Sequence, residues 1–385
     1  MNYKNRFPML VNNPDLVYFD NGALALKPDL VCEAGNDFYT KYSISTRTKD
    51  SKLGLKTSAF ITQTRQKLAS LVDADEENVI FTSGSTESLN QIAMMVADIV
   101  KDGDEILFSL FNHASNVLPF FYYLQNKNVT YKYFSDQTEL LNMINPKTKI
   151  ICLSQITNNF NVKYDLDEIY KLCKENEVFL INDAAQAIAY KKVTIANCDA
   201  IIMSANKFYG PTGLGSMIFS KRLYNKLRPK KFGGGASKYL NYTDVLSPLA
   251  FEAGTQNFAG IFQLNSALDF VNEIGLENIN KKVTKISYYL HNKLKELDNI
   301  VLYSKPGDVI CLFNVKNVAS QDVASYLGNN SIYVRSGTFC AWFMENISEV
   351  KGTYVRVSLG FYNDESDVNK LIDKLKTGGD FLDYL

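Results

Sequence analysis

The chain has 385 residues, more than one hydrophobic core usually serves, so we expect a main domain with a smaller companion. Lysine plus arginine and aspartate plus glutamate both number 41, giving no net charge, and no long basic run appears; nucleic acid is therefore excluded as an expected partner. Neither an apolar signal core nor a run of about 18 apolar residues occurs, which predicts a cytoplasmic protein without membrane contact. The six cysteines lack metal-ligand spacing, so neither zinc nor a disulfide framework is expected.

Short apolar runs alternate with helical patterns between residues 60 and 220. The predicted strands cover residues 79–83, 105–110, 129–134, 149–156, 178–183, 200–204 and 216–220. Between two of them, Asp165 and Glu168 form a capping-box pattern that opens a predicted helix over 166–176. Such strand–helix units predict an α/β fold with a mostly parallel seven-stranded sheet flanked by helices.

The pattern changes after about Gly260, where helices are predicted over 261–274, 279–297 and 365–376 with short strands between them. We therefore predict a large domain of residues 15–260. A smaller α+β domain would combine residues 1–14 with 261–385. His291 falls within the second of these helices and is expected on its solvated face.

Two segments that follow predicted strands carry candidate binding groups. After the first strand, a glycine turn leads into a helix start, where free backbone N–H groups and the hydroxyls of Ser85 and Thr86 suit a phosphate. The alternative is an ordinary helix cap. His113 follows the second strand and is either structural or an imidazole that stacks on a flat cofactor ring and moves protons near neutral pH.

Asp183 and Lys207 stand at the ends of two successive predicted strands, 24 residues apart. Alone, the aspartate could be a helix cap, the neighbouring Gln186 a surface amide and the lysine a solvated side chain. Together they match what pyridoxal phosphate needs, because a lysine forms the Schiff base and an aspartate pairs with the pyridine nitrogen. The sequence therefore predicts a pyridoxal phosphate site and, since no metal ligands are needed, no metal.

The chain resembles the fold-type I pyridoxal phosphate enzymes of the class V aminotransferase superfamily, and within it the SufS-type (group II) cysteine desulfurases. The resemblance covers nearly the whole length. Its motifs are an opening segment at 19–28, the phosphate turn at 81–90, the histidine segment at 112–119, the Thr157-Asn158 pair, and the blocks at 182–186, 204–213, 251–257, 334–341 and 355–363. The Lys-x-Tyr-Gly-Pro-x-Gly and Phe-Glu-Ala-Gly-Thr runs are its most specific parts.

The resemblance implies a role for each matching position. The catalytic residues would be Cys340, Lys207 and His113, with His113 lying on the ring face. Cofactor contacts would come from Ser85, Thr86, Ser204 and Asn206 at the phosphate, from Asn158 and Gln186 at the ring hydroxyl, from Asp183 at the ring nitrogen, and from Thr255 across a dimer interface. The substrate would meet Arg356, Ala23 and Asn158, with the Arg356 fork on its carboxylate.

Cys340 decides which pyridoxal chemistry the chain would perform. It could be a buried packing residue, but the matched Arg-x-Gly-x-x-Cys-Ala run favours a nucleophile. The resemblance then implies a homodimeric cysteine desulfurase that converts L-cysteine to L-alanine, leaves a persulfide on Cys340, and hands sulfur to a SufE- or SufU-like acceptor protein for iron–sulfur cluster assembly. The alternatives are a selenocysteine lyase, an enzyme of the same fold in which Cys340 is structural, and a catalytically idle scaffold.

Four positions depart from the family pattern, among them Asp50, which stands where the family has a histidine after the Arg47 region. Asn206 replaces the histidine before the lysine, and Asn161 replaces a glycine after the Thr157-Asn158 pair. Gln321 stands where members that deliver sulfur to a zinc-bearing scaffold protein have a histidine. The sequence therefore does not decide the details of the substrate entrance or the way in which a sulfur acceptor docks.

Overall fold

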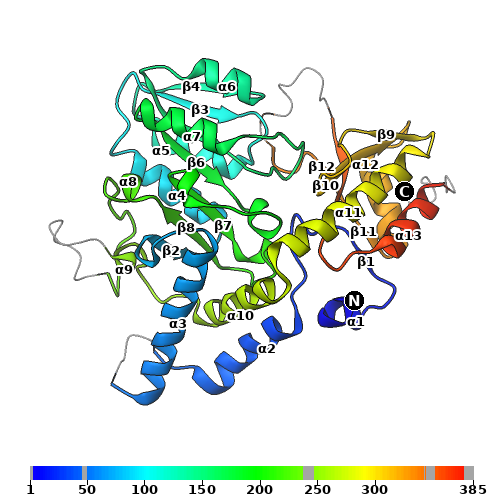
Figure 1. Cartoon of the computed structure of the whole chain (residues 1–385), viewed down its shortest axis with the longest axis horizontal. Coiled ribbons are helices and arrows are strands. Elements are labelled where there is room, and N and C mark those ends of the chain that lie inside the picture. Colours follow the sequence, from blue (N-terminus) through cyan, green and yellow to red (C-terminus); the bar gives the residue numbers. More distant parts are fainter. Residues whose placement is uncertain (1–2, 46–49, 237–246, 342, 344–351, 377–385) are drawn as a thin grey trace.

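A computed structural model describes residues 3–45, 50–236, 247–341, 343 and 352–376 of the chain. Figure 1 shows the large sheet and the helices around it at the left of the molecule, and the smaller sheet at the right. The α-helices are α1 (Pro8–Val11), α2 (Asp29–Asp37), α3 (Lys52–Leu71), α4 (Ser85–Val96), α5 (Leu118–Tyr123), α6 (Gln137–Met143), α7 (Leu166–Glu175), α8 (Lys221–Tyr224), α9 (Pro248–Phe251), α10 (Phe258–Ile274), α11 (Leu276–Lys295), α12 (Ser320–Asn329) and α13 (Glu365–Lys376).

The large sheet has the seven predicted strands, in the order β2-β8-β7-β6-β5-β3-β4. They are β2 (Val79–Thr82), β3 (Glu105–Ser109), β4 (Thr130–Phe134), β5 (Thr148–Leu153), β6 (Phe179–Asp183), β7 (Ala200–Ser204) and β8 (Gly215–Phe219). Only β8 runs antiparallel to its neighbours. The mostly parallel seven-stranded sheet predicted from the sequence is therefore confirmed.

Both faces of this sheet are covered, and successive residues of a strand enter different cores. In β7, Ile201 and Met203 belong to one hydrophobic cluster while Ala200 and Ile202 belong to the other. The first cluster also takes residues of α3, α7 and α10, and the second takes residues of α4 and α5. Burial on both sides explains why these strands read as continuous apolar runs in the sequence.

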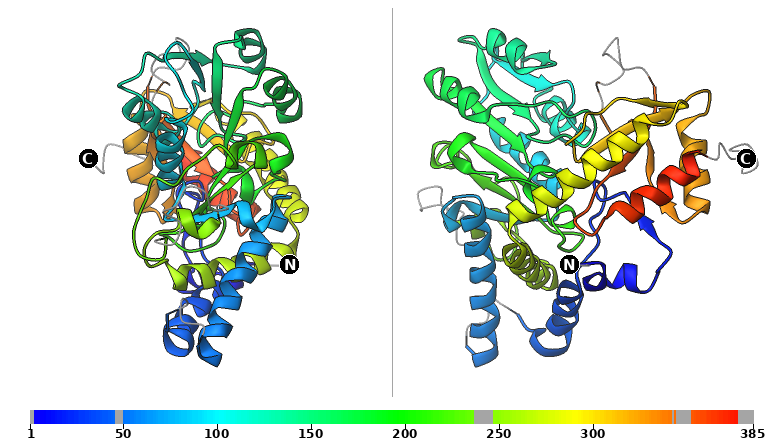
Figure 2. Two further views of the ribbon diagram at one scale, coloured as in Figure 1. Left: turned by 90° about the vertical axis from the view of Figure 1, so that its left-hand side faces the viewer. Right: turned by 45° about the vertical axis from the view of Figure 1, so that its right-hand side comes forward.

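A second, antiparallel sheet follows in the order β12-β13-β10-β9. Its strands are β9 (Ile300–Leu302), β10 (Ile310–Val315), β12 (Arg335–Gly337) and β13 (Tyr354–Ser358). The long helices α10 and α11 lead from the large sheet toward it, as Figure 2 shows. We propose that the two sheets mark the two predicted domains.

The beginning of the chain is built into the second half of the structure. Strand β1 (Val17–Tyr18) pairs in parallel with β11 (Ile332–Tyr333). The Lys4 amine lies 2.6 Å from an Asp367 carboxylate oxygen, and the ring of Phe7 packs edge-on against Tyr362 at 4.9 Å. The N-terminal segment therefore completes the packing of the C-terminal elements.

His291 is an exception to the sequence expectations, because it is fully buried rather than solvated. Its Nδ1 lies 2.8 Å from the Ser287 carbonyl oxygen and its Nε2 lies 2.8 Å from the Ser304 hydroxyl. The helical pattern alone did not show that the second sheet covers this face of α11.

No helix in the part of the chain that the structure describes is long and apolar enough to cross a membrane.

Candidate active site

Polar side chains gather at one edge of the large sheet. Strands β2, β3, β5, β6 and β7 all end at this edge, where open α/β sheets bind their ligands, and β8 begins there. A cavity of about 360 Å³ opens at it. Its lining includes nine of the predicted site residues: Ser85, Thr86, His113, Asn158, Asp183, Gln186, Ser204, Asn206 and Lys207.

One end of the cavity is the N-terminus of α4. Gly84 is its N-cap residue, and no side chain of the described residues caps the helix, so its first N–H groups are available to an anion. The Thr86 hydroxyl lies 3.0 Å from that of Ser115. Gly215 lets β8 approach this turn, because a Cβ at that position would lie 2.5 Å from the Gly84 Cα. This end has the shape and donors of a phosphate site.

The carboxylate of Glu87 holds this turn in place. Glu87 accepts hydrogen bonds from the Ser83 backbone N–H and, at 3.0 Å, from the Lys231 amine. Although burial raises it, the pKa of Glu87 is lowered to about 2 by these hydrogen bonds. Glu87 is therefore ionised at neutral pH, and its hydrogen bonds order the turn.

At the other end of the cavity lie Asp183, Lys207 and His113. Burial raises the pKa of Asp183, whose carboxylate accepts a 3.1 Å hydrogen bond from the Ala185 N–H. Burial lowers the pKa of Lys207, and the nearby Asp183 charge opposes that shift. A buried carboxylate of this kind needs a cationic partner in the site, as a pyridine nitrogen that carries a proton would be.

His113 is a neutral ring at pH 7. Burial, and then the positive charges of Lys207, Arg335 and Arg356, lower its pKa to about 4. Its Nδ1 accepts a 3.2 Å hydrogen bond from the Ser115 N–H, which places the ring proton on Nε2. The imidazole is thus oriented and uncharged, as stacking on a flat ring requires.

Cys340 is exposed, next to the cavity rather than in its wall. Phe339 and Cys340 both have left-handed backbone conformations, with φ of 56° and 57°. Two hydrogen bonds of 2.8 Å hold their carbonyl groups: the Asn158 side-chain amide donates to the Phe339 oxygen, and the Ala114 N–H donates to the Cys340 oxygen. Since such conformations are unfavourable for residues other than glycine, the surrounding contacts must impose them.

Arg356 lies on β13 and is almost completely buried. Its guanidinium donates to the Asn158 carbonyl at 3.1 Å and to an Asp20 carboxylate oxygen at 2.7 Å, while Nε has no partner among the described residues. A buried guanidinium with a spare N–H is unusual, because unpaired buried donors are costly. Arg356 does not line the cavity, and its Nε is buried within the protein.

Two other predicted residues lie apart from this cavity. Thr255 lines a different cavity of about 460 Å³, together with Phe38 and Tyr39. Ala23 does not line the main cavity, but its carbonyl accepts a 3.1 Å hydrogen bond from the Asn206 side chain. The opening segment of the chain therefore supports the turn that carries Lys207.

Three of the departures from the family pattern, Asn206, Asn161 and Gln321, have partners among the described residues. Asn206 lies in hydrogen-bonding distance of the Ser204 hydroxyl and of Ala23. Asn161 donates to Asp308 at 2.6 Å, which links the loop after β5 to the second half of the chain. Gln321 accepts a 2.7 Å hydrogen bond from Ser336 on β12.

The sequence analysis missed several residues of the cavity wall. Ser154, Ile156, Thr212 and Gly213 line it, as does Glu87. A signal existed for some of them, since Thr212 and Gly213 lie in the Lys-x-Tyr-Gly-Pro-x-Gly run and Ser154 directly follows a strand. Glu87 stands at the third position of its helix, where an acid normally bonds back to the preceding turn.

Comparisons with known proteins agree with this geometry. Residues 17–371 match the family described as Aminotransferase class-V. A protein of Ureaplasma parvum named as a probable cysteine desulfurase is 34% identical over 388 residues, covering 97% of this chain and 96% of that protein. One of Mycoplasma genitalium with the same name is 32% identical and covers 97% of this chain and 95% of that protein.

Solved structures share the fold. The cysteine desulfurase CsdA of Escherichia coli superimposes with a TM-score of 0.89 at 24% identity, covering 100% of this chain and 98% of that one. A cysteine desulfurase of Thermococcus onnurineus gives a TM-score of 0.88 at 25% identity, covering 97% of each chain. The likeness extends over the full length and includes both sheets.

Proposed function

Because the chain belongs to the class-V aminotransferase family, we propose that it is a pyridoxal phosphate-dependent cysteine desulfurase. Its substrate is L-cysteine and its products are L-alanine and a persulfide on Cys340. The observation that carries this proposal is the juxtaposition of Cys340 with a lysine–aspartate cavity, since the Cys340 backbone is hydrogen-bonded to the residue after His113.

The residues present fit the cofactor. The uncapped N-terminus of α4 offers N–H donors for the phosphate, and buried Asp183 offers a counter-charge for the ring nitrogen. Ser204, Asn206, Asn158 and Gln186 would contribute further polar contacts, with His113 on the ring face and Lys207 at the aldehyde carbon. Bound there, pyridoxal phosphate supplies an electron sink for the substrate α-carbon.

The chain's own groups then have separate tasks. Lys207, whose pKa burial lowers, takes and returns the proton at the substrate α-carbon. Arg356 would bind the substrate carboxylate through its guanidinium fork, the role that the resemblance implies. The Cys340 thiolate attacks the substrate sulfur, so the S–S bond forms while the substrate C–S bond breaks. The electron pair of the broken bond stays on the β-carbon, which takes up the proton that the substrate thiol gives up, and the remaining three-carbon skeleton leaves as alanine.

The sulfur acceptor, the cellular location and the use of the sulfur are inferred from the resemblance. We infer a group II enzyme, because Arg356 follows Cys340 by only 16 positions and two hydrogen bonds restrain the cysteine backbone. The persulfide would pass to a SufE- or SufU-like protein in the cytoplasm, for iron–sulfur cluster assembly. Gln321 in place of a histidine argues against docking through a partner's zinc ion.

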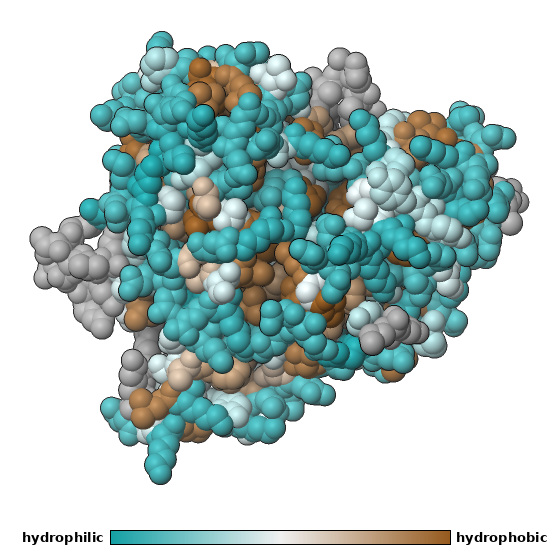
Figure 3. All heavy atoms as spheres, in the orientation of Figure 1, coloured by the Kyte–Doolittle hydropathy of each residue, from teal (hydrophilic) through white to brown (hydrophobic). Residues whose placement is uncertain are grey.

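We also infer a homodimer. Thr255 faces a separate cavity, so its expected contact with a phosphate requires a second copy of the chain. The arm formed by residues 29–45 and 50–60 projects from the body of the molecule and exposes Tyr39, Leu53 and Leu55 (Figures 2 and 3). Exposed apolar groups on a projecting arm are typical of a surface that another subunit covers.

The decisive experiment uses Cys340→Ser. The variant should bind the cofactor like the wild type, because the cavity lining is unchanged, yet release almost no sulfide from cysteine, since a serine hydroxyl is hardly ionised at neutral pH. Mass spectrometry of the wild type after incubation with cysteine should find one extra sulfur on Cys340. Normal turnover by the variant would refute the proposed role, and faster release of selenide from selenocysteine would make the chain a selenocysteine lyase instead.

A further inference from the structure

The segment around Cys340 is anchored in both hydrophobic cores. Phe339 and Ala341 belong to the first cluster and Phe343 belongs to the second, while Cys340 between them is exposed. In the second cluster, every other buried residue of the described chain comes from residues 80–251. Phe343 therefore inserts into a core that otherwise belongs to the large sheet and its helices.

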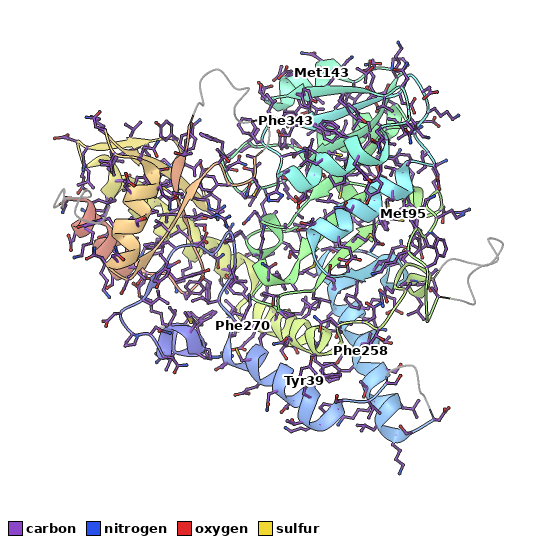
Figure 4. All side chains as sticks on the ribbon, turned by 180° about the vertical axis from the view of Figure 1, so that it is seen from behind. Tyr39, Met95, Met143, Phe258, Phe270 and Phe343 are labelled. Carbon is purple, nitrogen blue, oxygen red and sulfur yellow. The ribbon has the colours of Figure 1, made fainter. Side chains whose placement is uncertain are left out.

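The contacts of Phe343 are aromatic. Its ring lies 4.3 Å from that of Tyr133 on β4 and 6.4 Å, nearly edge-on, from that of Phe121 on α5. The side chain is 5% exposed. Figure 4 shows it beside the large sheet, away from the strands of the small sheet. Tilted ring pairs at such distances add stabilisation beyond the area they bury.

The Phe343 ring packs beside the segment that carries His113. Helix α5 begins five residues after His113, and the short helix Ala114–Asn116 between them donates the Ala114 N–H to the Cys340 carbonyl. Phe121 of α5 then contacts Phe343. Three residues beyond the cysteine, the chain is thus fixed to the same structural unit that holds the imidazole.

We propose that Phe343 is a positioning residue for Cys340. Its insertion beside Phe121 and Tyr133 holds the cysteine segment on the large sheet, and keeps Phe339 and Cys340 in their left-handed conformations at the mouth of the cavity. The proposal rests on the proposed function for its catalytic consequence, but the anchoring itself can be measured without turnover.

The experiment compares Phe343→Ala with Phe343→Leu and with Phe134→Ala as a matched control. Phe134 is a buried ring on β4, next to the Tyr133 that Phe343 contacts, but it belongs to the first cluster and packs against Tyr164. Phe343→Leu keeps much of the apolar volume, so it provides a folded variant should the alanine variant not fold. All chains are studied as purified protein loaded with pyridoxal phosphate.

The first readout is hydrogen exchange at the Ala114 amide, which the Cys340 carbonyl protects. In Phe343→Ala this exchange should accelerate on the order of tenfold, equivalent to about 1.4 kcal/mol of lost anchoring. Phe343→Leu should show a smaller increase, and Phe134→Ala none at this amide. Wild-type protection of Ala114 in the folded Phe343 variants would overturn the proposal.

The second readout is steady-state sulfide release. Phe343→Ala should lower kcat with little change in the KM for cysteine, because Arg356 and the cavity lining are untouched. An increased exchange rate without a change in kcat would show that the anchor does not position Cys340 for reaction, which also overturns the proposal. If the wild type releases no sulfide at all, the proposed function fails, whereas the exchange measurement still decides whether Phe343 holds the segment.

Discussion

Lys207 is the residue whose loss should be easiest to see. In Lys207→Ala no other amine of the described cavity lining can bind the aldehyde of pyridoxal phosphate. The purified variant should therefore lose the yellow absorption of the protein-bound cofactor, and borohydride should no longer fix the cofactor to the protein. A reducible linkage at another lysine in this variant would contradict the assignment.

At the residue scale, the sequence predicted the residues that line the cavity better than it predicted the contacts around Arg356 and Cys340. Lys207, Asp183 and His113 could be predicted because each stands at or just beyond the end of a buried strand, and the carboxyl ends of parallel strands meet at one edge of the sheet. The pairing of Arg356 with Asp20 and the insertion of Phe343 depend on how distant segments pack. No local pattern encodes such contacts.

Among the elements, β2, α3 and the segment leading to Thr255 are joined by one buried ion pair. Arg65 on α3 bonds bidentately to Glu252 at 2.8 and 2.9 Å, and the Phe81 N–H of β2 donates to the same carboxylate at 2.7 Å. Glu252 is the acid of the Phe-Glu-Ala-Gly-Thr run. Its role is therefore structural, since it fixes the start of the segment that ends at Thr255.

Glu252→Gln should lower the free energy of unfolding by about 3 kcal/mol, because it leaves a buried guanidinium without its counter-charge. Glu277→Gln is the control, since Glu277 pairs with Lys281 at 3.8 Å on an exposed helix surface and should contribute less than about 0.5 kcal/mol. Urea denaturation of both variants measures the difference. Equal effects would mean that the buried pair has no special role.

Helix α11 gives the fold a pH dependence through His291. Burial lowers the pKa of His291 below its usual 6.5, so the unfolded chain takes up a proton before the folded protein does. Its contribution to stability is therefore complete above about pH 6.5, and declines as the pH falls from there toward the lowered folded value, by up to about 1.4 kcal/mol per pH unit.

Comparing the wild type with His291→Gln isolates this contribution, because His113 titrates in the same direction in both proteins. The stability difference between the two proteins should shrink when urea denaturation is repeated from pH 7 down to pH 5. A difference independent of pH would mean that His291 is protonated equally in both states.

At the element scale, the seven strands of the large sheet were predicted within three residues at each end, because apolar runs of strand length are bounded by turn residues. The face of α11 could not be predicted in the same way. A helical pattern shows which side is apolar, but it does not distinguish the buried polar pair Ser287 and His291, which the half-buried Ser304 contacts, from solvated residues.

For the whole molecule, the proposed dimer predicts that each site uses two chains. A mixture of Lys207→Ala and Thr255→Ala chains should form heterodimers in which one site carries both substitutions and the other carries neither. Such mixtures should therefore bind more pyridoxal phosphate and release more sulfide than either variant alone. If Thr255 served its own subunit, mixing would restore nothing, and sedimentation would separate that result from a failure to exchange subunits.

The pairing of β1 with β11 sets an order in which the parts of the chain can fold during synthesis. The seven strands of the large sheet lie within residues 79–219, so this part can fold while translation continues, whereas Val17 must wait for Ile332. Those positions are 315 residues apart, which corresponds to roughly 15 to 60 s at ordinary elongation rates. Until Tyr362 has been made, the ring of Phe7, which is buried in the folded protein, lacks this neighbour and is open to chaperones. A prematurely released polypeptide would therefore carry an intact large sheet and an uncovered Phe7 ring, a combination that protein quality control can recognise.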